Sequence, residues 1–179
     1  MEELIRDWGY IILFLYSFGG GFIALVVAGI LSYSGELNII ITILVAGVSN
    51  FLGDQFLFTL ARKNKHQAKQ MMQKHKRKIA ISHLLMRKYG TWVVFIQKYI
   101  YGVKTLIPLA MGLTKYDYKK FLFFNILATT LWACIVGIAA YMLGELVYKY
   151  IDQVKSYIPF VIVVIILVVI YFFKKVDRK

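Results

Sequence analysis

The stretch QKYIYGVKTLIPLAMG, from Gln97 to Gly112, places two lysines, two glycines and a proline inside an otherwise apolar run. A lysine at the centre of a bilayer costs roughly 2.5–3.5 kcal/mol on insertion, although near a helix end it can extend to the headgroups. Snorkelling would explain one lysine, but Lys98 and Lys104 flank Gly102, which favours a chain reversal within the membrane. Backbone N–H groups freed by such a reversal, together with the two ammonium groups, would attract a phosphate or carboxylate.

The composition around this stretch is that of an integral membrane protein. Of the 179 residues, 60% are hydrophobic, and the mean hydropathy is +0.66, whereas soluble domains are about 45–50% apolar. The apolar runs at 122–143 and 157–173 are close to the roughly 20 residues that a crossing helix needs. Cys134 stands alone, which excludes a disulfide within one chain.

The apolar blocks and the breaks between them predict one polytopic, all-α membrane domain over residues 1–179. Three glycines, Gly19–Gly21, would break the first apolar block into two half-helices. We expect an inverted-repeat bundle with two re-entrant hairpins and about three full transmembrane helices. Its segments are hairpin 1 (8–34), a crossing helix (38–61), a basic amphipathic segment (62–88), hairpin 2 (90–113) and two further crossing helices (121–144 and 157–173).

The charge distribution predicts the orientation. Residues 62–88 contain ten Lys or Arg and no Asp or Glu. In the expected layout this segment, residues 115–120 and the basic C-terminal tail share one face, which the positive-inside rule makes cytoplasmic. The excess charge of +13 is therefore better explained by topology and anionic lipid than by nucleic-acid binding.

A weak internal repeat accompanies this layout. A broken hairpin, Ala28-Gly29, a polar turn and a long apolar helix recur as a second hairpin, Met111-Gly112, a polar turn and a second long helix. The glycines differ by 83 in residue number, and an odd crossing separates the copies, so they would lie inverted. Inverted repeats with broken helices are how many secondary carriers form a substrate site.

Few other residues suggest a binding or catalytic role. Asp54 is the sole carboxylate deep within a predicted crossing, and it would serve either as a partner for a lysine or hydroxyl or as a proton or cation site. Asn50 and Asn125 favour interhelical hydrogen bonds, and Trp132 favours packing. The sequence carries no enzymatic signature and no metal-ligand spacing, so neither an enzyme nor a cofactor is expected.

The segment FIQKYIYGVKTLIPLAMGLTKYDYKKFLFFNILATTLW resembles the second signature of the DedA membrane proteins, also called the SNARE-associated or VTT-domain family. The matching residues are Phe95, Lys98, Gly102, Lys104, Thr105, Pro108, Gly112, Phe121, Asn125 and Trp132. An upstream segment is similar to the first signature through Ala28, Gly29, Gly53, Asp54, Phe58 and Arg62. Two signature arginines are Lys98 and Lys104 here, and the acids of the family's first hairpin are absent.

The resemblance implies a flippase of the bacterial inner membrane, which translocates undecaprenyl phosphate or a phospholipid such as phosphatidylethanolamine. Headgroup binding would fall to Lys98, Lys104, Gly102, Thr105, Gly20 and Gly21. Proton coupling would fall to Asp54 or Glu36, and Asn125, Pro108 and Trp132 would support the site. The expected partners are membrane lipids and not nucleic acid, with self-association into a homo-oligomer allowed.

Two other functional classes are also compatible with the sequence. A scaffold or lipid-binding protein without transport would act through the basic segment 62–88. An ion or small-solute transporter would rely on Asp54. Neutralising the basic segment separates the first alternative from a carrier, because only the scaffold would lose its activity.

Overall fold

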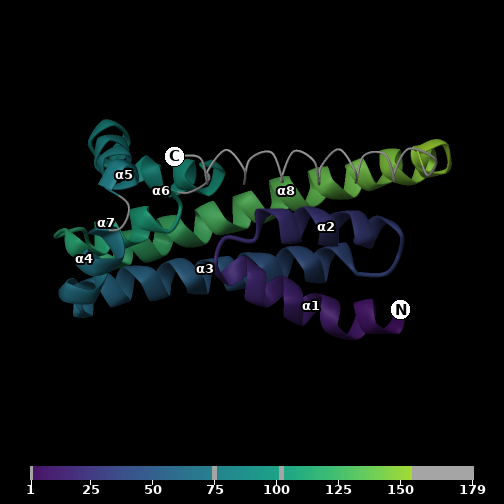
Figure 1. The fold of residues 1–179 in the computed structure, drawn as a ribbon, viewed down its shortest axis with the longest axis horizontal. Helices are drawn as coiled ribbons and strands as arrows, with labels where there is room; N and C mark the ends of the chain where they lie inside the picture. Colours follow the sequence, from purple (N-terminus) through teal and green to yellow (C-terminus); the bar gives the residue numbers. More distant parts are fainter. Residues whose placement is uncertain (1, 74–75, 101–102, 155–179) are drawn as a thin grey trace, which may run out of the picture.

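The computed structural model describes residues 2–73, 76–100 and 103–154, and within these ranges the regular structure is entirely helical. In the part of the chain that the structure describes, two helices are long and apolar enough to cross a membrane, α3 (Ile39–Lys63) and α8 (Tyr118–Val154). They pack together along the long axis of the molecule (Figure 1). The predicted crossing at 157–173 lies outside the described residues.

The first apolar block forms two helices, α1 (Glu2–Phe18) and α2 (Phe22–Tyr33), joined by the three glycines. The N–H of Gly20 donates to the Ser17 carbonyl and that of Gly21 to the Tyr16 carbonyl, which is the bond pair of a Schellman motif. That motif needs a positive φ, and φ of Gly20 is 134°. The glycines therefore end α1 and turn the chain back, although α1 begins six residues before the predicted hairpin.

The second broken segment consists of short pieces. They are η1 (Gly90–Trp92), α6 (Val93–Ile96), η2 (Gln97–Tyr99) and α7 (Leu106–Leu113). The interruption falls between Tyr99 and Leu106, and Gly102 within it lies outside the described residues. Pro108 lies in the first turn of α7, where the missing N–H has no intrahelical partner to lose.

The remaining helices differ from expectation mainly in length. The basic segment forms α4 (Lys65–Gln73) and α5 (Lys76–Tyr89), while its first two residues continue α3. The crossing predicted at 121–144 lies within a longer helix, since α8 runs from Tyr118 to Val154. Gly144 does not end the helix but allows close packing, since a Cβ there would lie 2.6 Å from the Tyr33 Cβ.

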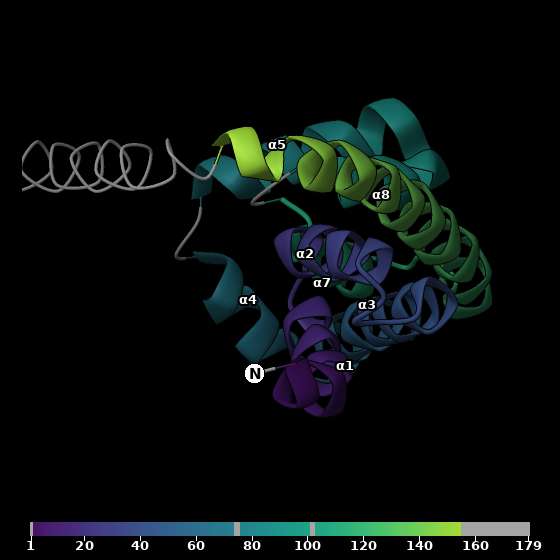
Figure 2. The same cartoon turned by 90° about the vertical axis from the view of Figure 1, so that its right-hand side faces the viewer.

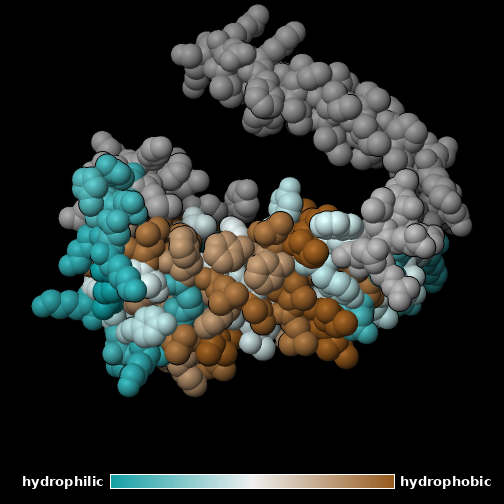
Figure 3. Space-filling model, turned by 90° about the horizontal axis from the view of Figure 1, so that it is seen from below, coloured by the Kyte–Doolittle hydropathy of each residue, from teal (hydrophilic) through white to brown (hydrophobic). Residues whose placement is uncertain are grey.

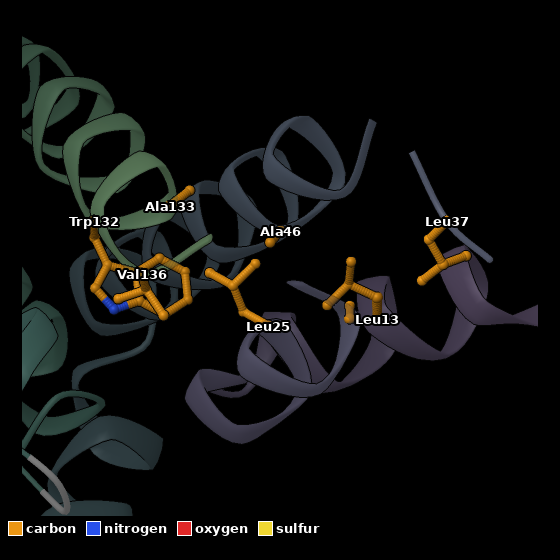
Figure 4. Packing of buried hydrophobic residues seen from close by; sticks show 8 residues of the cluster. Leu13, Leu25, Leu37, Ala46, Trp132, Ala133 and Val136 are labelled. Carbon is orange, nitrogen blue, oxygen red and sulfur yellow. The ribbon is translucent and has the colours of Figure 1, made fainter. Parts of the chain in front are cut away.

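The helices of the two broken segments pack on the two long helices, α3 and α8. α1 lies along α3 and α2 along α8, whereas α7 packs on α3 at the other end of the molecule (Figures 1 and 2). One apolar cluster joins α1, α2, α3 and α8 through Leu13, Leu25, Ala46, Trp132, Ala133 and Val136 (Figure 4). Hydrophilic residues gather at the end that holds α4 and α5, and an apolar band covers the middle (Figure 3).

Candidate functional site

Lys98 is buried at the centre of a polar cluster formed by three elements. Its ammonium forms an ion pair with Asp54 and donates to Asn50 Oδ1 at 2.7 Å and to Asn125 Oδ1 at 3.1 Å. Lys98 comes from η2, Asn50 and Asp54 from α3, and Asn125 from α8. An ammonium has three donors, so every donor of Lys98 is used.

The two asparagines are themselves oriented by backbone groups. Asn50 Nδ2 donates to the carbonyl of Ser17, 3.3 Å away at the end of α1, and Asn125 Nδ2 donates to the Phe51 carbonyl at 3.5 Å. Both amide oxygens are thereby directed toward Lys98. The two asparagines therefore take part in hydrogen bonds between elements, as predicted, and both accept from Lys98.

Lys104 lies beyond the interruption and has a different environment. Its ammonium donates to the Gly20 carbonyl at 2.9 Å and lies 4.6 Å from the centroid of the Trp132 ring. Cation–π contact of this kind stabilises an ammonium without neutralising it. Among the described residues no carboxylate forms a salt bridge with Lys104, so its charge is uncompensated there.

The end of α1 reaches this site because Gly53 allows it. A Cβ on Gly53 would lie 2.1 Å from the carbonyl oxygen of Phe18, a distance that no side chain tolerates. The glycine on α3 therefore lets the three-glycine turn settle beside Asn50 and Lys104. The Gly20 carbonyl of that turn is thereby brought to Lys104.

A groove of about 1770 Å³ opens at the two chain interruptions and continues between α1 and α2. At one end it is lined by Lys98, Lys104, Thr105, Gly20 and Gly21. Five of the six predicted headgroup residues thus lie together, and the sixth, Gly102, falls outside the described part of the chain. The lining beyond them is apolar apart from Tyr16 and Tyr99.

The predicted supporting and coupling residues divide into two groups. Trp132 lies under Lys104, Asn125 binds Lys98, and Asp54 is the carboxylate of the cluster. Glu36 is not brought to the site, since it precedes α3 and fifteen helical residues, about 22 Å, separate the start of that helix from Asp54. Asn50 was missed as a lysine ligand, although its i, i+4 spacing with Asp54 places both on one helix face.

Comparison with known proteins agrees with the resemblance in the sequence. The family model for the VTT domain matches residues 8–142. The inner membrane protein YohD of Escherichia coli K12 is 26% identical over 158 residues, which cover 88% of this chain and 82% of YohD. The inner membrane protein YqjA of the same strain is 36% identical over 77 residues, 42% of this chain and 35% of YqjA.

A mycobacterial relative extends the comparison. The membrane protein Rv0364 of Mycobacterium tuberculosis H37Rv is 27% identical over 131 residues, which cover 69% of this chain and 57% of Rv0364. No solved structure matches the chain significantly. Two of these relatives are named as inner membrane proteins, which supports a bacterial inner membrane location. With the family model covering most of its length, this chain belongs to the VTT-domain (DedA) family of membrane proteins.

Proposed function

We propose that this protein is a lipid carrier that moves an anionic headgroup, such as that of undecaprenyl phosphate or a phospholipid, across the inner membrane. The observation that carries the proposal is the ammonium of Lys104 at the polar end of an apolar groove, which no carboxylate of the described residues neutralises. A cation held in such a position is costly, and a phosphate entering the groove would offset that cost. Acyl chains would remain in contact with lipid or apolar side chains, so only the headgroup needs a polar path.

The site would bind phosphate through Lys104 and the Thr105 hydroxyl, both of which line the groove. Lys98 has no free donor in this conformation. It would join the site only after leaving Asp54. The pair is therefore the natural element to change between two states of a carrier, with Asp54 available for a proton once Lys98 departs.

The packing pattern supports an inverted repeat with re-entrant hairpins. Gly29 of α2 packs on α8, where a Cβ would lie 2.6 Å from the Ala140 Cβ, and Gly112 of α7 packs on α3, where a Cβ would lie 2.4 Å from the Phe58 carbonyl oxygen. The second half of each broken segment thus uses the long helix of the other repeat. Carriers with inverted repeats place their substrate site where the broken helices meet, and that is where Lys104 contacts Gly20.

The orientation proposed from charge agrees with the arrangement of the helices. Arg62 and Lys63 at the end of α3, the helices α4 and α5, and Lys119 and Lys120 at the start of α8 occupy one end of the molecule (Figures 1 and 3). We assign this end to the cytoplasm on the positive-inside rule. The loop between α2 and α3 would face the opposite side.

Transport in proteoliposomes tests the proposal. A fluorescent anionic phospholipid is placed in one leaflet, and its appearance in the other is followed by a membrane-impermeant quencher. Lys104→Ala should abolish protein-dependent movement, and Lys104→Arg should retain most of it because the charge persists. Movement at the wild-type rate by correctly folded Lys104→Ala protein would exclude Lys104 from headgroup binding and overturn the proposal.

A further inference from the structure

We propose that the groove between α1 and α2 is a binding site for the hydrocarbon chain of the lipid whose headgroup lies on Lys104. The inference rests on the proposed function for the headgroup, but the chain site has its own evidence and its own test. It assigns a role to the first apolar hairpin beyond that of a membrane anchor. The ligand class is an amphiphile with one phosphate group and a long alkyl or isoprenoid chain.

The lining of the groove fits a chain of this kind. Both walls carry large apolar side chains that are half-exposed although they face the hollow, namely Trp8, Ile12, Leu15, Phe22, Ile23 and Val27. Ordinary lipid-facing helices are convex, whereas this surface is hollowed to about 1770 Å³, more than the roughly 300–1,000 Å³ of most small-ligand sites. The hollow is continuous with the one uncompensated cation in the described core.

The length of the groove also fits. Its far end is marked by Leu37, just before α3 begins at Ile39, and its polar end lies near Gly53, which touches the end of α1. Fourteen helical residues separate Ile39 from Gly53, which corresponds to about 21 Å. That exceeds the roughly 15 Å of hydrocarbon in one leaflet, half of the bilayer core. The groove is therefore long enough for an extended chain whose phosphate lies at Lys104.

The polar end can hold a phosphate without rearrangement of the backbone. Lys104 uses one donor on the Gly20 carbonyl, which leaves two donors for an anion. Thr105 is exposed at the same place and lines the groove. Because Asp54 already neutralises Lys98, the site offers one net positive charge, which favours a singly charged phosphate group.

The test uses two hexadecyl probes, a phosphate and the corresponding alcohol, each with a diazirine at the far end of the chain. The purified protein is labelled in maltoside detergent and the modified peptides are identified by mass spectrometry. We expect labels near Trp8 and Leu31 at the far end of the groove. Labelling spread equally over lipid-facing residues outside the groove, such as Val48 and Ile138, would overturn the proposed chain site.

Matched variants separate the chain site from the headgroup site. Val27 lines the groove and is 49% exposed, while Val48 does not line it and is 52% exposed. Val27→Trp should lower labelling by both probes at least tenfold, whereas Val48→Trp should change it less than twofold. Ile23→Trp provides a second groove variant should Val27→Trp fail to fold as judged by size exclusion.

Lys104→Ala gives the independent readout for the headgroup. It should lower labelling by hexadecyl phosphate at least tenfold and leave labelling by the alcohol unchanged. If Lys104→Ala changes neither probe while Val27→Trp reduces both, the phosphate role fails and the chain site stands. If Val27→Trp and Val48→Trp act alike, the chain site fails whatever Lys104 does.

Discussion

The ammonium of Lys98 and the carboxylate of Asp54 form a buried ion pair that joins the second broken segment to the middle of α3. Burying two charges is expensive, and the pair is tolerable only when the remaining hydrogen-bonding groups are also satisfied. Asn50 and Asn125 meet that requirement for Lys98. The cluster therefore fixes the position of the interruption relative to both long helices, and Lys104 with it.

Removing either charge alone should destabilise the protein strongly. Lys98→Met leaves the Asp54 carboxylate buried without a counter-ion, and Asp54→Leu does the same to the Lys98 ammonium, at a typical cost of about 3–5 kcal/mol. The double variant leaves no isolated charge, so it should be more stable than either single variant. Thermal unfolding in detergent, followed by size exclusion, would reveal this order. A double variant less stable than both single variants would contradict the ion-pair interpretation.

Lys104 should behave in the opposite way. Its contacts are one hydrogen bond to Gly20 and the Trp132 ring, each worth on the order of 1 kcal/mol. Lys104→Ala should therefore lower the unfolding temperature far less than Lys98→Met under the same conditions, while it abolishes lipid movement. Equal thermal destabilisation by the two variants would show that Lys104 is as much a part of the fold as Lys98.

Neutralising the basic end should modulate transport without abolishing it. Lys63, Lys65 and Lys88 are exposed at that end, and each basic residue near an anionic surface contributes about 1 kcal/mol to attraction. The triple change to glutamine should reduce the initial rate less than tenfold, and the reduction should shrink at high salt. Complete loss of activity, with Lys104→Ala unaffected, would instead favour a scaffold that acts through this basic segment.

Some features of the fold could be predicted from the sequence alone, and others could not. The three-glycine turn was predictable because positive φ and missing side chains are properties of glycine itself. Membrane insertion followed from apolar runs of sufficient length, and the family match agrees with it. The close packing of Gly144 against Tyr33 was not predictable, because it is a contact between two helices that are far apart in the sequence.

The different contacts of the two lysines could likewise not be predicted from the sequence. Both lie near Gly102 in the same apolar stretch, and both matched the same kind of family position. Only the tertiary arrangement places Lys98 against Asp54, 44 residues away in the chain, and Lys104 against Gly20, 84 residues away. Contacts between residues so far apart in the chain leave no periodic pattern in either segment. The sequence therefore predicted the same role, headgroup binding, for both lysines.

Two glycines of α3 offer a sharp test of the approach between α1 and α3. A Cβ at Gly53 would lie 2.1 Å from the Phe18 carbonyl oxygen, whereas one at Gly47 would lie 3.5 Å from the Ala133 Cβ, an ordinary contact. Gly53→Ala should separate α1 from α3, lower the unfolding temperature and displace Gly20 from Lys104. Gly47→Ala should be neutral or stabilising, because alanine is favoured over glycine within a helix by about 1 kcal/mol. A cysteine pair placed at Phe18 and Phe56, whose rings lie 6.0 Å apart between centroids, would report the separation as a slower rate of disulfide formation in a Gly53→Ala background. Unchanged cross-linking and stability in that background would mean that α1 does not rest on Gly53, and the close approach of the three-glycine turn to α3 would then need another explanation.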